Sequence, residues 1–249
     1  HLLLQSHEAL PILTNAQAPL TEAITVVNEH GEIQSLNIPA ERALTVYVDK
    51  QELVTLMTLG ARPEQLVLGY LRNQRLVDSV DDVASITVDW EVGAAAVHTR
   101  GGIARWQELP ATRITQSDLY SIVNQIRLMD SVYKQAGSVH GCALFQQERL
   151  LTFVEDVGRH NAIDTIAGWQ WLQEAQTLRP VGQLDAPTQG HVFYTTGRMT
   201  SEMVIKAAQM GVAVVISRSG ITQMGYEVAK RLGVCTIGRA HNRHFVAYT

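Results

Sequence analysis

The stretch that most constrains the fold is residues 150–171, where an apolar run passes through a glycine turn into an Ala/Ile-rich segment. The apolar run predicts a strand, and the segment after Gly158 predicts a helix. A strand that turns into a helix in this way points backbone N–H groups and the positive end of the helix dipole at one place. Arg159 and His160 fall at that place. The turn therefore predicts an anion-binding site.

The alternation of strand, turn and helix continues through the second half of the sequence. Strands that are apolar on both faces and alternate with helices indicate a mostly parallel sheet covered on both sides. We therefore predict an α/β domain over residues 115–249, which opens with a helix capped by Thr115 or Ser117. Its predicted strands are 139–145, 150–154, 191–196, 212–217, 234–237 and 245–248, and its later helices are 161–171, 201–210 and one that ends at Gly233.

Residues 21–99 predict a smaller α+β domain. Two strand-like runs, 24–29 and 33–38, flank His30-Gly31-Glu32 and predict a hairpin. We expect residues 1–20 to form a partly ordered arm and residues 100–114 to form a linker or active loop. The remaining predicted elements of the small domain are strands at 43–48, 53–59, 83–90 and 94–99 and a helix that opens at 61–65.

The composition is that of a folded protein with no bulk attraction for polyanions. Hydrophobic residues make up 46% and charged residues 18% of the 249 positions. The net charge of -4 and the pI near 6.1 predict no binding to nucleic acid or to an anionic membrane. No apolar run approaches the roughly 18 residues that cross a bilayer. With only two cysteines, Cys142 and Cys235, the sequence fits a reducing compartment, and we expect a cytoplasmic protein.

Arginines recur in the turns that follow the predicted parallel strands. Right-handed connections place such turns at one edge of a sheet, where open α/β sheets bind ligands. The planar guanidinium suits phosphate, so we predict a phosphate or pyrophosphate ligand. The alternative is that these arginines are solvated or pair with Asp156, Asp164, Glu202 and Glu227. The arginines of the successive turns are Arg159, Arg198, Arg218 and Arg239.

Histidines suggest two further arrangements. Asp164 follows His160 by four residues on one face of the predicted helix, so Asp164 could orient His160 for a structural or a catalytic role. His140 and Cys142 alternate on one face of a strand, as a metal-ligand or nucleophile pair would. The zinc deaminase pattern needs a Cys-x-x-Cys that the sequence lacks. We therefore predict no metal site and expect Cys142 and Cys235 to pack as small apolar residues.

Four segments, in order, carry a family resemblance. They are Gly-Ser-Val-His-Gly-Cys-Ala at 137–143, Glu-Asp-Val-Gly-Arg-His-Asn-Ala-Ile-Asp at 155–164, Gly-Arg-Met-Thr-Ser-Glu-Met-Val at 197–204 and Ser-Arg-Ser-Gly-Ile-Thr at 217–222. Together with Tyr248-Thr249 they resemble motifs of the FdhD/NarQ family of formate dehydrogenase accessory sulfurtransferases. Gly141 and Cys142 depart from the first motif. The N-terminal residues are compatible with the family but less diagnostic.

The resemblance implies a fold and a function. The fold is a cytidine-deaminase-like three-layer core with a smaller N-terminal domain, in a homodimer. The function is to receive sulfur from a cysteine desulfurase as a persulfide and to pass it to the molybdenum bis(molybdopterin guanine dinucleotide) cofactor before insertion into formate dehydrogenase. GDP is then an analogue of the bound substrate. The predicted cofactor-binding residues are Ile216, Ser217, Arg218, Ser219, Gly220, Ile221, Arg159, His160 and Arg198.

One feature of the family is missing from this sequence. The persulfide cysteine of the family lies in a Cys-x-x-Cys just after the position of Arg100-Gly101-Gly102, but here Ile103-Ala104-Arg105 follows without a cysteine. A persulfide needs a thiolate on an accessible loop. Two accounts remain for the catalytic residue. Either a cysteine-bearing loop after Gly102 is lacking from this sequence, or the protein is a homologue that binds the cofactor without transferring sulfur.

Overall fold

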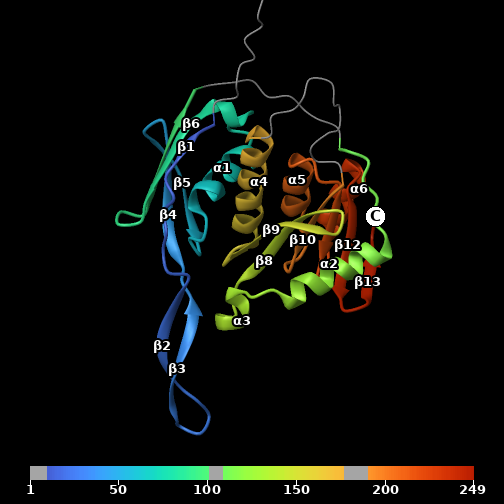
Figure 1. The fold of residues 1–249 in the computed structure, drawn as a ribbon, viewed down its shortest axis with the longest axis horizontal. Helices are drawn as coiled ribbons and strands as arrows, with labels where there is room; N and C mark the ends of the chain where they lie inside the picture. The colour runs from blue at the N-terminus through green and yellow to red at the C-terminus, as the bar shows by residue number, and fades with distance from the viewer. Residues whose placement is uncertain (1–9, 101–108, 177–189) are drawn as a thin grey trace, which may run out of the picture.

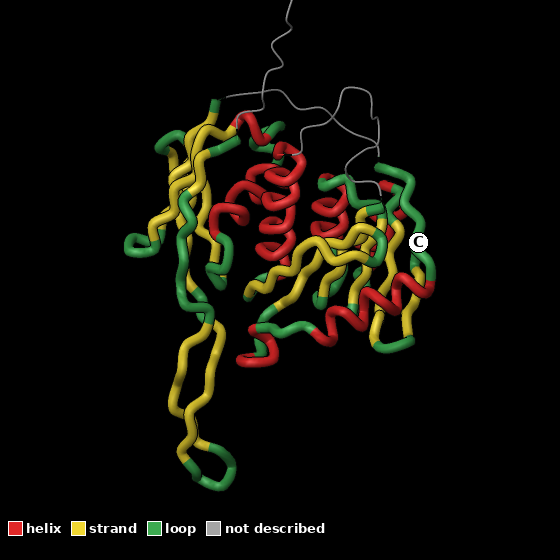
Figure 2. The backbone as a smooth tube through the Cα atoms, in the orientation of Figure 1, coloured by secondary structure: helices red, strands yellow, loops and turns green. Residues whose placement is uncertain are grey.

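The computed structural model describes residues 10–100, 109–176 and 190–249. Figure 1 shows two β-sheets with helices α1 (Pro63–Asn73) and α4 (Arg159–Gln176) between them, and a hairpin that projects from one end. Figure 2, coloured by secondary structure, shows the same two groups of strands with helices between them. The predicted combination of an α/β part with a smaller N-terminal part agrees with this mixed architecture.

The N-terminal sheet has five strands in the order β1-β6-β7-β4-β5. We predicted residues 1–20 as an arm, but β1 pairs in parallel with β6, so residues 10–20 belong with this sheet. Residues 1–9 of the predicted arm lie outside the described residues. A short 3-10 helix, η1 (Val80–Asp82), precedes β6. The strands are β1 (Ile12–Leu13), β4 (Arg42–Val48), β5 (Gln51–Thr58), β6 (Val83–Asp89) and β7 (Ala94–Thr99).

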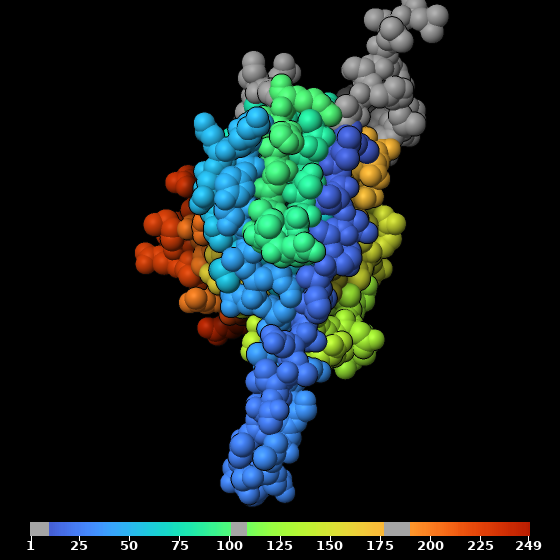
Figure 3. All heavy atoms as spheres, turned by 90° about the vertical axis from the view of Figure 1, so that its left-hand side faces the viewer, coloured from blue at the N-terminus to red at the C-terminus, as the bar shows by residue number. Residues whose placement is uncertain are grey.

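Strands β2 (Thr21–Val27) and β3 (Ile33–Pro39) form the predicted hairpin as a separate two-stranded sheet. Asn28 shapes its turn, because the side-chain oxygen accepts two backbone N–H groups of the turn at 3.0 Å each. Arg42 fixes its base by donating a hydrogen bond to the carbonyl of Pro19 at 2.7 Å. Figure 3 shows the hairpin extending well beyond the five-stranded sheet.

The second sheet has six strands in the order β13-β12-β11-β10-β8-β9. Strands β10, β11 and β12 are parallel, whereas β8, β9 and β13 join antiparallel. The prediction of a mostly parallel sheet is therefore wrong. The turns of β8–β9 and β12–β13 are too short for a parallel connection. The strands are β8 (His140–Gln146), β9 (Arg149–Asp156), β10 (His191–Thr195), β11 (Val214–Ser217), β12 (Cys235–His241) and β13 (His244–Ala247).

Helices cover both faces of the six-stranded sheet and give it three layers. Helices α4, α5 (Ser201–Gln209) and α6 (Gln223–Leu232) enclose one apolar core, which includes the fully buried Phe193. Helix α2 (Gln116–Leu128) covers the other face, against the fully buried Phe145. The three-layer arrangement agrees with the prediction, and its likeness to cytidine deaminases stays a prediction.

The start of α2 was predicted correctly. Thr115 caps the helix: its hydroxyl accepts the N–H of Asp118 at 3.1 Å, and the Asp118 carboxylate accepts the N–H of Thr115 at 2.9 Å. Leu128, the last residue of α2, is 63% exposed. The chain then forms an unpredicted short helix, α3 (Val132–Ala136), whose first two N–H groups donate to the buried carboxylate of Glu155 at 2.6 and 3.1 Å.

The two sheets are joined through the crossing of α1 and α4. The helices meet at Gly69 and Gly168, and both residues are buried. A Cβ at Gly69 would stand 1.4 Å from the carbonyl oxygen of Asp164, and one at Gly168 would stand 2.0 Å from the carbonyl oxygen of Gln65. Backbone therefore packs directly on backbone, which a residue with a side chain cannot permit. The glycines fix how close the two sheets lie.

We expect Gly69→Ala to destabilise the protein by on the order of 3 kcal/mol, because the new methyl group must push α1 away from α4. The measurement is the free energy of unfolding in urea. Gly158→Ala is the matched control, since its Cβ would meet its nearest neighbour at an ordinary 3.6 Å. A loss for Gly69→Ala no larger than that of the control would contradict the close crossing.

Candidate cofactor-binding edge

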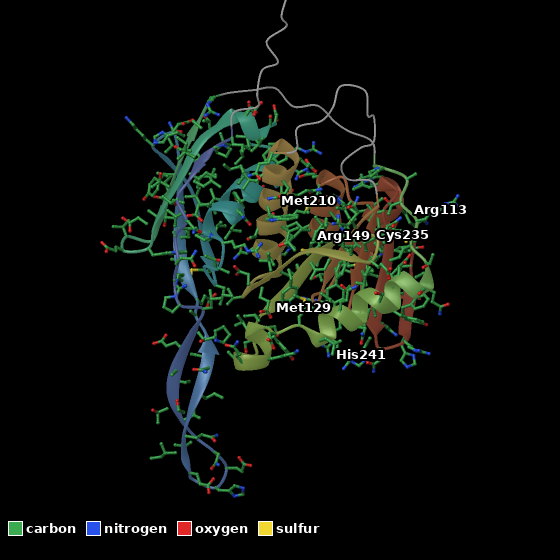
Figure 4. All side chains as sticks on the ribbon, in the orientation of Figure 1. Arg113, Met129, Arg149, Met210, Cys235 and His241 are labelled. Atoms are coloured by element: carbon green, nitrogen blue, oxygen red, sulfur yellow. The ribbon has the colours of Figure 1, made fainter. Side chains whose placement is uncertain are left out.

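Strands β9, β10 and β11 end at one edge of the six-stranded sheet, because β10 and β11 are parallel and both β9 and β10 are antiparallel to β8. Each leads into a helix, so α4, α5 and α6 all begin at this edge. We call it the arginine edge and define it as residues 156–160, 196–200, 218–222 and 238–239. Figure 4 labels Cys235 and His241 at opposite ends of β12, and the arginine edge lies toward His241.

Hydrogen bonds join the neighbouring turns of the arginine edge into one surface. The N–H of Met199 donates to the carbonyl of Gly220 at 3.0 Å, and the N–H of Thr222 donates to the carbonyl of Met199 at 3.1 Å. The hydroxyl of Ser217 donates to the carbonyl of Gly197 at 2.6 Å. A ligand at one turn therefore rests on a backbone that the next turn holds in place.

In the predicted cofactor segment, residues 216–221, some residues support the turn from inside and others can contact a ligand. Ile216 and Ser217 are fully buried, so they shape the turn and do not face a ligand. Arg218 is exposed, and the three residues after it are half-buried. The backbone N–H of Arg218 donates to the carbonyl of Thr195 at 3.0 Å, which fixes the turn from which the exposed side chain extends.

Arg159 and His140 lie together at the start of α4. A Cβ at Gly197 would stand 2.7 Å from Arg159 Cδ and 3.4 Å from His140 Nδ1, so the absence of a side chain there makes room for both. Arg159 Nε and Thr200 Oγ1 are buried and have no hydrogen-bond partner in the described part of the chain. Buried polar atoms without partners at the starts of two helices fit an anionic oxygen.

The arginines of the edge do not pair with carboxylates. Within the described ranges, no carboxylate lies at ion-pair distance from Arg159, Arg198 or Arg218, and the last two are exposed. The alternative that pairs them with nearby carboxylates is therefore wrong. Asp164 pairs with Lys206 instead, and Glu202 lies beside His160. The guanidinium groups therefore have no carboxylate partner among the described residues, which favours an anionic ligand.

His160 and Asp164 have different partners, so the prediction that Asp164 orients His160 is wrong. His160 Nε2 lies 3.1 Å from a carboxylate oxygen of Glu202, which is exposed. Asp164 is 1% exposed, and Lys206 Nζ donates to its two oxygens at 2.8 and 2.7 Å. Asn73 Nδ2 donates to Asp164 at 2.6 Å. Asp164 therefore joins α1, α4 and α5 inside the protein.

Asp156 connects the arginine edge to the N-terminal sheet. Its carboxylate accepts the hydroxyl of Thr58 at 2.6 Å and the N–H of Leu59 at 3.2 Å, both at the end of β5. It also accepts the N–H of Gly158 and the amide of Asn161, each at 3.2 Å. Burial raises the pKa of Asp156, and these four hydrogen bonds act against that rise. The turn that presents Arg159 is thus fixed from both sheets.

His160 of the arginine edge and the adjacent His140 favour their neutral form. Burial lowers the pKa of His140, and the neighbouring Arg159 lowers it further. Burial also lowers the pKa of His160; Glu202 acts in the opposite direction, and Arg159, Lys206 and His140 add to the lowering. A neutral imidazole can donate one hydrogen bond and accept another. Arg159, Arg198 and Arg218 therefore carry the positive charge of the site, with the histidines as hydrogen-bonding groups.

Neither cysteine is placed as a sulfur carrier at this edge. Cys142 is fully buried, its Sγ lies 3.4 Å from Thr195 Oγ1, and burial raises its pKa to about 12. Cys235 is half-buried at the far end of β12, and burial raises its pKa as well (Figure 4). Both pack with apolar neighbours, as predicted. The segment after Gly102, where the resemblance predicts a Cys-x-x-Cys, lies outside the described residues.

The structure places two further residues at the arginine edge that the predicted cofactor-binding residues did not include. Arg239, exposed, donates its backbone N–H to the carbonyl of Ser219 at 2.7 Å. The repeated Gly-Arg pattern pointed to it. Tyr248 lies against Gly238, where a Cβ would stand 2.5 Å from the tyrosine ring. No periodicity signals that contact. Among the described residues, no three His, Cys, Asp or Glu side chains cluster as they would around a metal ion.

A protein-family comparison identifies the chain. The model of the FdhD/NarQ family matches residues 39–108 and 102–249. The chain belongs to the FdhD/NarQ family. The match includes all four predicted motifs and every residue of the arginine edge. Its two parts meet at residues 102–108, the place where the family's cysteine motif was expected.

Relatives with curated names span most of the chain. Sulfur carrier protein FdhD of Bacillus licheniformis is 27% identical over 252 residues, covering 89% of this chain and 92% of that protein. Sulfur carrier protein FdhD of Bacillus subtilis is 26% identical over 252 residues, covering 89% and 92%. Sulfur carrier protein FdhD of Sulfurisphaera tokodaii is 24% identical over 258 residues, covering 94% and 97%.

A solved structure has the same fold. It is that of a formate dehydrogenase accessory protein from Desulfotalea psychrophila, with a TM-score of 0.78 and 24% identity over 93% of this chain and 97% of that chain. Separately, no helix among the described residues is long and apolar enough to cross a membrane.

We expect Lys206→Met to destabilise the protein by about 3 to 5 kcal/mol, because it leaves the carboxylate of Asp164 buried without its counter-ion. The double variant Lys206→Met with Asp164→Asn should recover a large part of this loss, since the amide oxygen still accepts from Asn73. Glu202→Gln is the control, because an exposed pair contributes at most about 1 kcal/mol. Equal losses for Lys206→Met and Glu202→Gln in urea unfolding would refute the buried pair.

Proposed function

We propose that this protein is a sulfur carrier that serves formate dehydrogenase. The observation that carries the proposal is membership of the FdhD/NarQ family over residues 39–249, together with relatives named sulfur carrier protein FdhD at high coverage. Its partners are then a cysteine desulfurase, which supplies the sulfur, and formate dehydrogenase, which receives the finished cofactor. We place the reaction in the cytoplasm and the protein in a homodimer.

The proposed substrate is the molybdenum bis(molybdopterin guanine dinucleotide) cofactor, bound at the arginine edge. Each of its pyrophosphates carries negative charge that suits a planar guanidinium. Two features support the assignment: the arginines lack carboxylate partners, and buried polar atoms of Arg159 and Thr200 lack hydrogen-bond partners within the described chain. The starts of α4, α5 and α6 add their dipoles at the same place.

The residues at and beside the arginine edge would take different parts in binding this substrate. Arg159 and His140 would take one phosphate beside Gly197, where no side chain blocks the approach. Arg218 and Arg239 would take another beside Gly220, and Arg198 lies on the turn between the two. Asp156 and Ser217 hold these turns and do not touch the substrate. The molybdenum centre supplies the bond to the transferred sulfur, and the protein positions its nucleotide arms.

A second function has an observation in its favour. Persulfide transfer needs a reactive thiolate, and neither Cys142, with a pKa raised to about 12, nor the half-buried Cys235 provides one. A non-catalytic chaperone that binds the molybdenum cofactor would need the arginine edge and no cysteine. The two functions therefore share the cofactor site and differ in whether the chain ever carries sulfur.

For the cofactor site, we expect GDP to bind and the double variant Arg159→Ala with Arg218→Ala to weaken its affinity by roughly 100-fold, since each lost charged contact costs about tenfold. Isothermal titration measures this. The matched control, Arg113→Ala with Arg149→Ala, removes two exposed arginines away from the edge (Figure 4) and should leave the affinity unchanged. Equal effects of the two double variants would remove the arginine edge as the site.

For sulfur transfer, incubation with a cysteine desulfurase and cysteine should add one sulfur atom per chain that a thiol reductant removes, as intact-mass spectrometry would show. Cys142→Ser and Cys235→Ser variants then locate the carrier. A chain that gains no sulfur but binds GDP would support the chaperone and reject the carrier. A chain that gains sulfur on Cys142 would contradict the buried, protonated thiol described above.

A further inference from the structure

The hairpin of β2 and β3 exposes apolar side chains far from any core. Val27 is 65% exposed and Ile33 is 76% exposed, and the two are cross-strand partners at the tip. Leu36, halfway along the hairpin, is 48% exposed. Figure 3 shows the hairpin standing clear of the five-stranded sheet. We call residues 21–39 the arm.

An isolated two-stranded arm has little stability of its own in water. Both of its strands are edges, so each presents unpaired backbone N–H and C=O groups along one side. Within its own chain, the short helix α3 packs against β3 near the base of the arm. The apolar tip and the two open edges are thus available to another molecule.

The charge of the arm restricts what that molecule can be. Residues 21–39 contain Glu22, Glu29 and Glu32 and no lysine or arginine. Glu29 and Glu32 flank the tip next to Val27 and Ile33. A surface that receives the tip must therefore combine apolar side chains with positive charge.

This chain carries such a surface at the base of its own arm. Leu128, at the end of α2, is 63% exposed, and Tyr133, in α3, is 55% exposed. Arg127 and Lys134 are exposed beside them, with Asp130 as the one acidic residue of the segment 124–136. We call Arg127, Leu128, Tyr133 and Lys134 the basal patch. Figure 1 shows α3 beside the base of the arm.

We propose that the occupant of the arm is a second copy of this chain, in a two-fold dimer whose arms lie antiparallel. Seven-residue strands make each arm about 23 Å long. With the two-fold axis at the middle of the arms, the tip of each arm reaches the basal patch of the other copy. The acidic tip then meets Arg127 and Lys134, and Val27 and Ile33 meet Leu128 and Tyr133. Such an interface is closed and self-complementary.

This inference goes beyond the homodimer named with the proposed function, because it assigns the interface and the residues that form it. It uses none of the cofactor-binding residues. Guanine nucleotide binding can therefore be intact when the interface fails, and a failure of one proposal is distinguishable from a failure of the other.

The test exchanges the charges of the two surfaces. The arm variant carries Glu29→Lys and Glu32→Lys, and the patch variant carries Arg127→Glu and Lys134→Glu. Sedimentation equilibrium should show a dimer for the unchanged chain and a dimer dissociation constant raised by roughly 100-fold for each variant alone, since two-fold symmetry repeats every altered pair. A mixture of the two variants should restore a dimer, because each arm then meets a patch of opposite charge.

Controls separate the interface from general charge effects. Glu52→Lys with Glu91→Lys alters two exposed carboxylates on the five-stranded sheet and its turn and should leave the dimer unchanged. Far-UV circular dichroism checks that every variant folds. A monomeric unchanged chain would overturn the proposal and leave the arm to a different protein. A dimer that both variants leave intact, or a mixture that stays monomeric, would overturn it as well.

Discussion

The direct contact of α1 with α4 is the constraint on which the rest of the structure depends. Gly69 and Gly168 let the two backbones touch, and the carbonyl oxygen of Asp164 lies where a Gly69 side chain would be. The side chain of the same Asp164 binds Lys206 of α5 and Asn73 of α1. One residue therefore ties three helices together, through its backbone on one side and its carboxylate on the other. Any change in the crossing would move α4 relative to both sheets.

This arrangement places the first turn of α4, and hence Arg159. Burial raises the pKa of Asp164, and its hydrogen bonds with Lys206 and Asn73 act against that rise. Both partners come from neighbouring helices, so a looser helix crossing would weaken the ion pair between Asp164 and Lys206. Asp156 adds a second connection, from the start of α4 to Thr58 of the N-terminal sheet. The guanidinium at the arginine edge is thus positioned by contacts that lie up to two turns deeper in the protein. The N-terminal sheet takes part in the site although it lends no residue to it.

The sequence predicted the elements well because each depends on local pattern. The cap at Thr115, the hairpin at 24–38 and the glycine turns before Arg159 and Arg218 follow from residue type and spacing. Partners that lie far apart in the sequence could not be predicted in this way. Nothing in the spacing of Asp164 and His160 reveals that Lys206, forty-two positions on, takes the carboxylate. The antiparallel strands were missed for a related reason, because a buried strand has the same apolar content in either direction. The two-residue turns set the direction only for β8–β9 and β12–β13, whereas the antiparallel pairing of β8 with β10 joins strands far apart in the chain.

Among the described residues, positive charge is paired with a carboxylate at the buried lysine inside the protein but not at the arginine edge. Inside, the one buried lysine has its carboxylate, because an unpaired charge there would cost several kcal/mol. At the arginine edge, Arg159 is half-buried, and the described residues offer it no carboxylate. The buried pair and the close helix crossing stabilise the fold away from the edge. Under the proposed function, an anionic ligand would supply at the edge the negative charge that Asp164 supplies to Lys206 inside the protein.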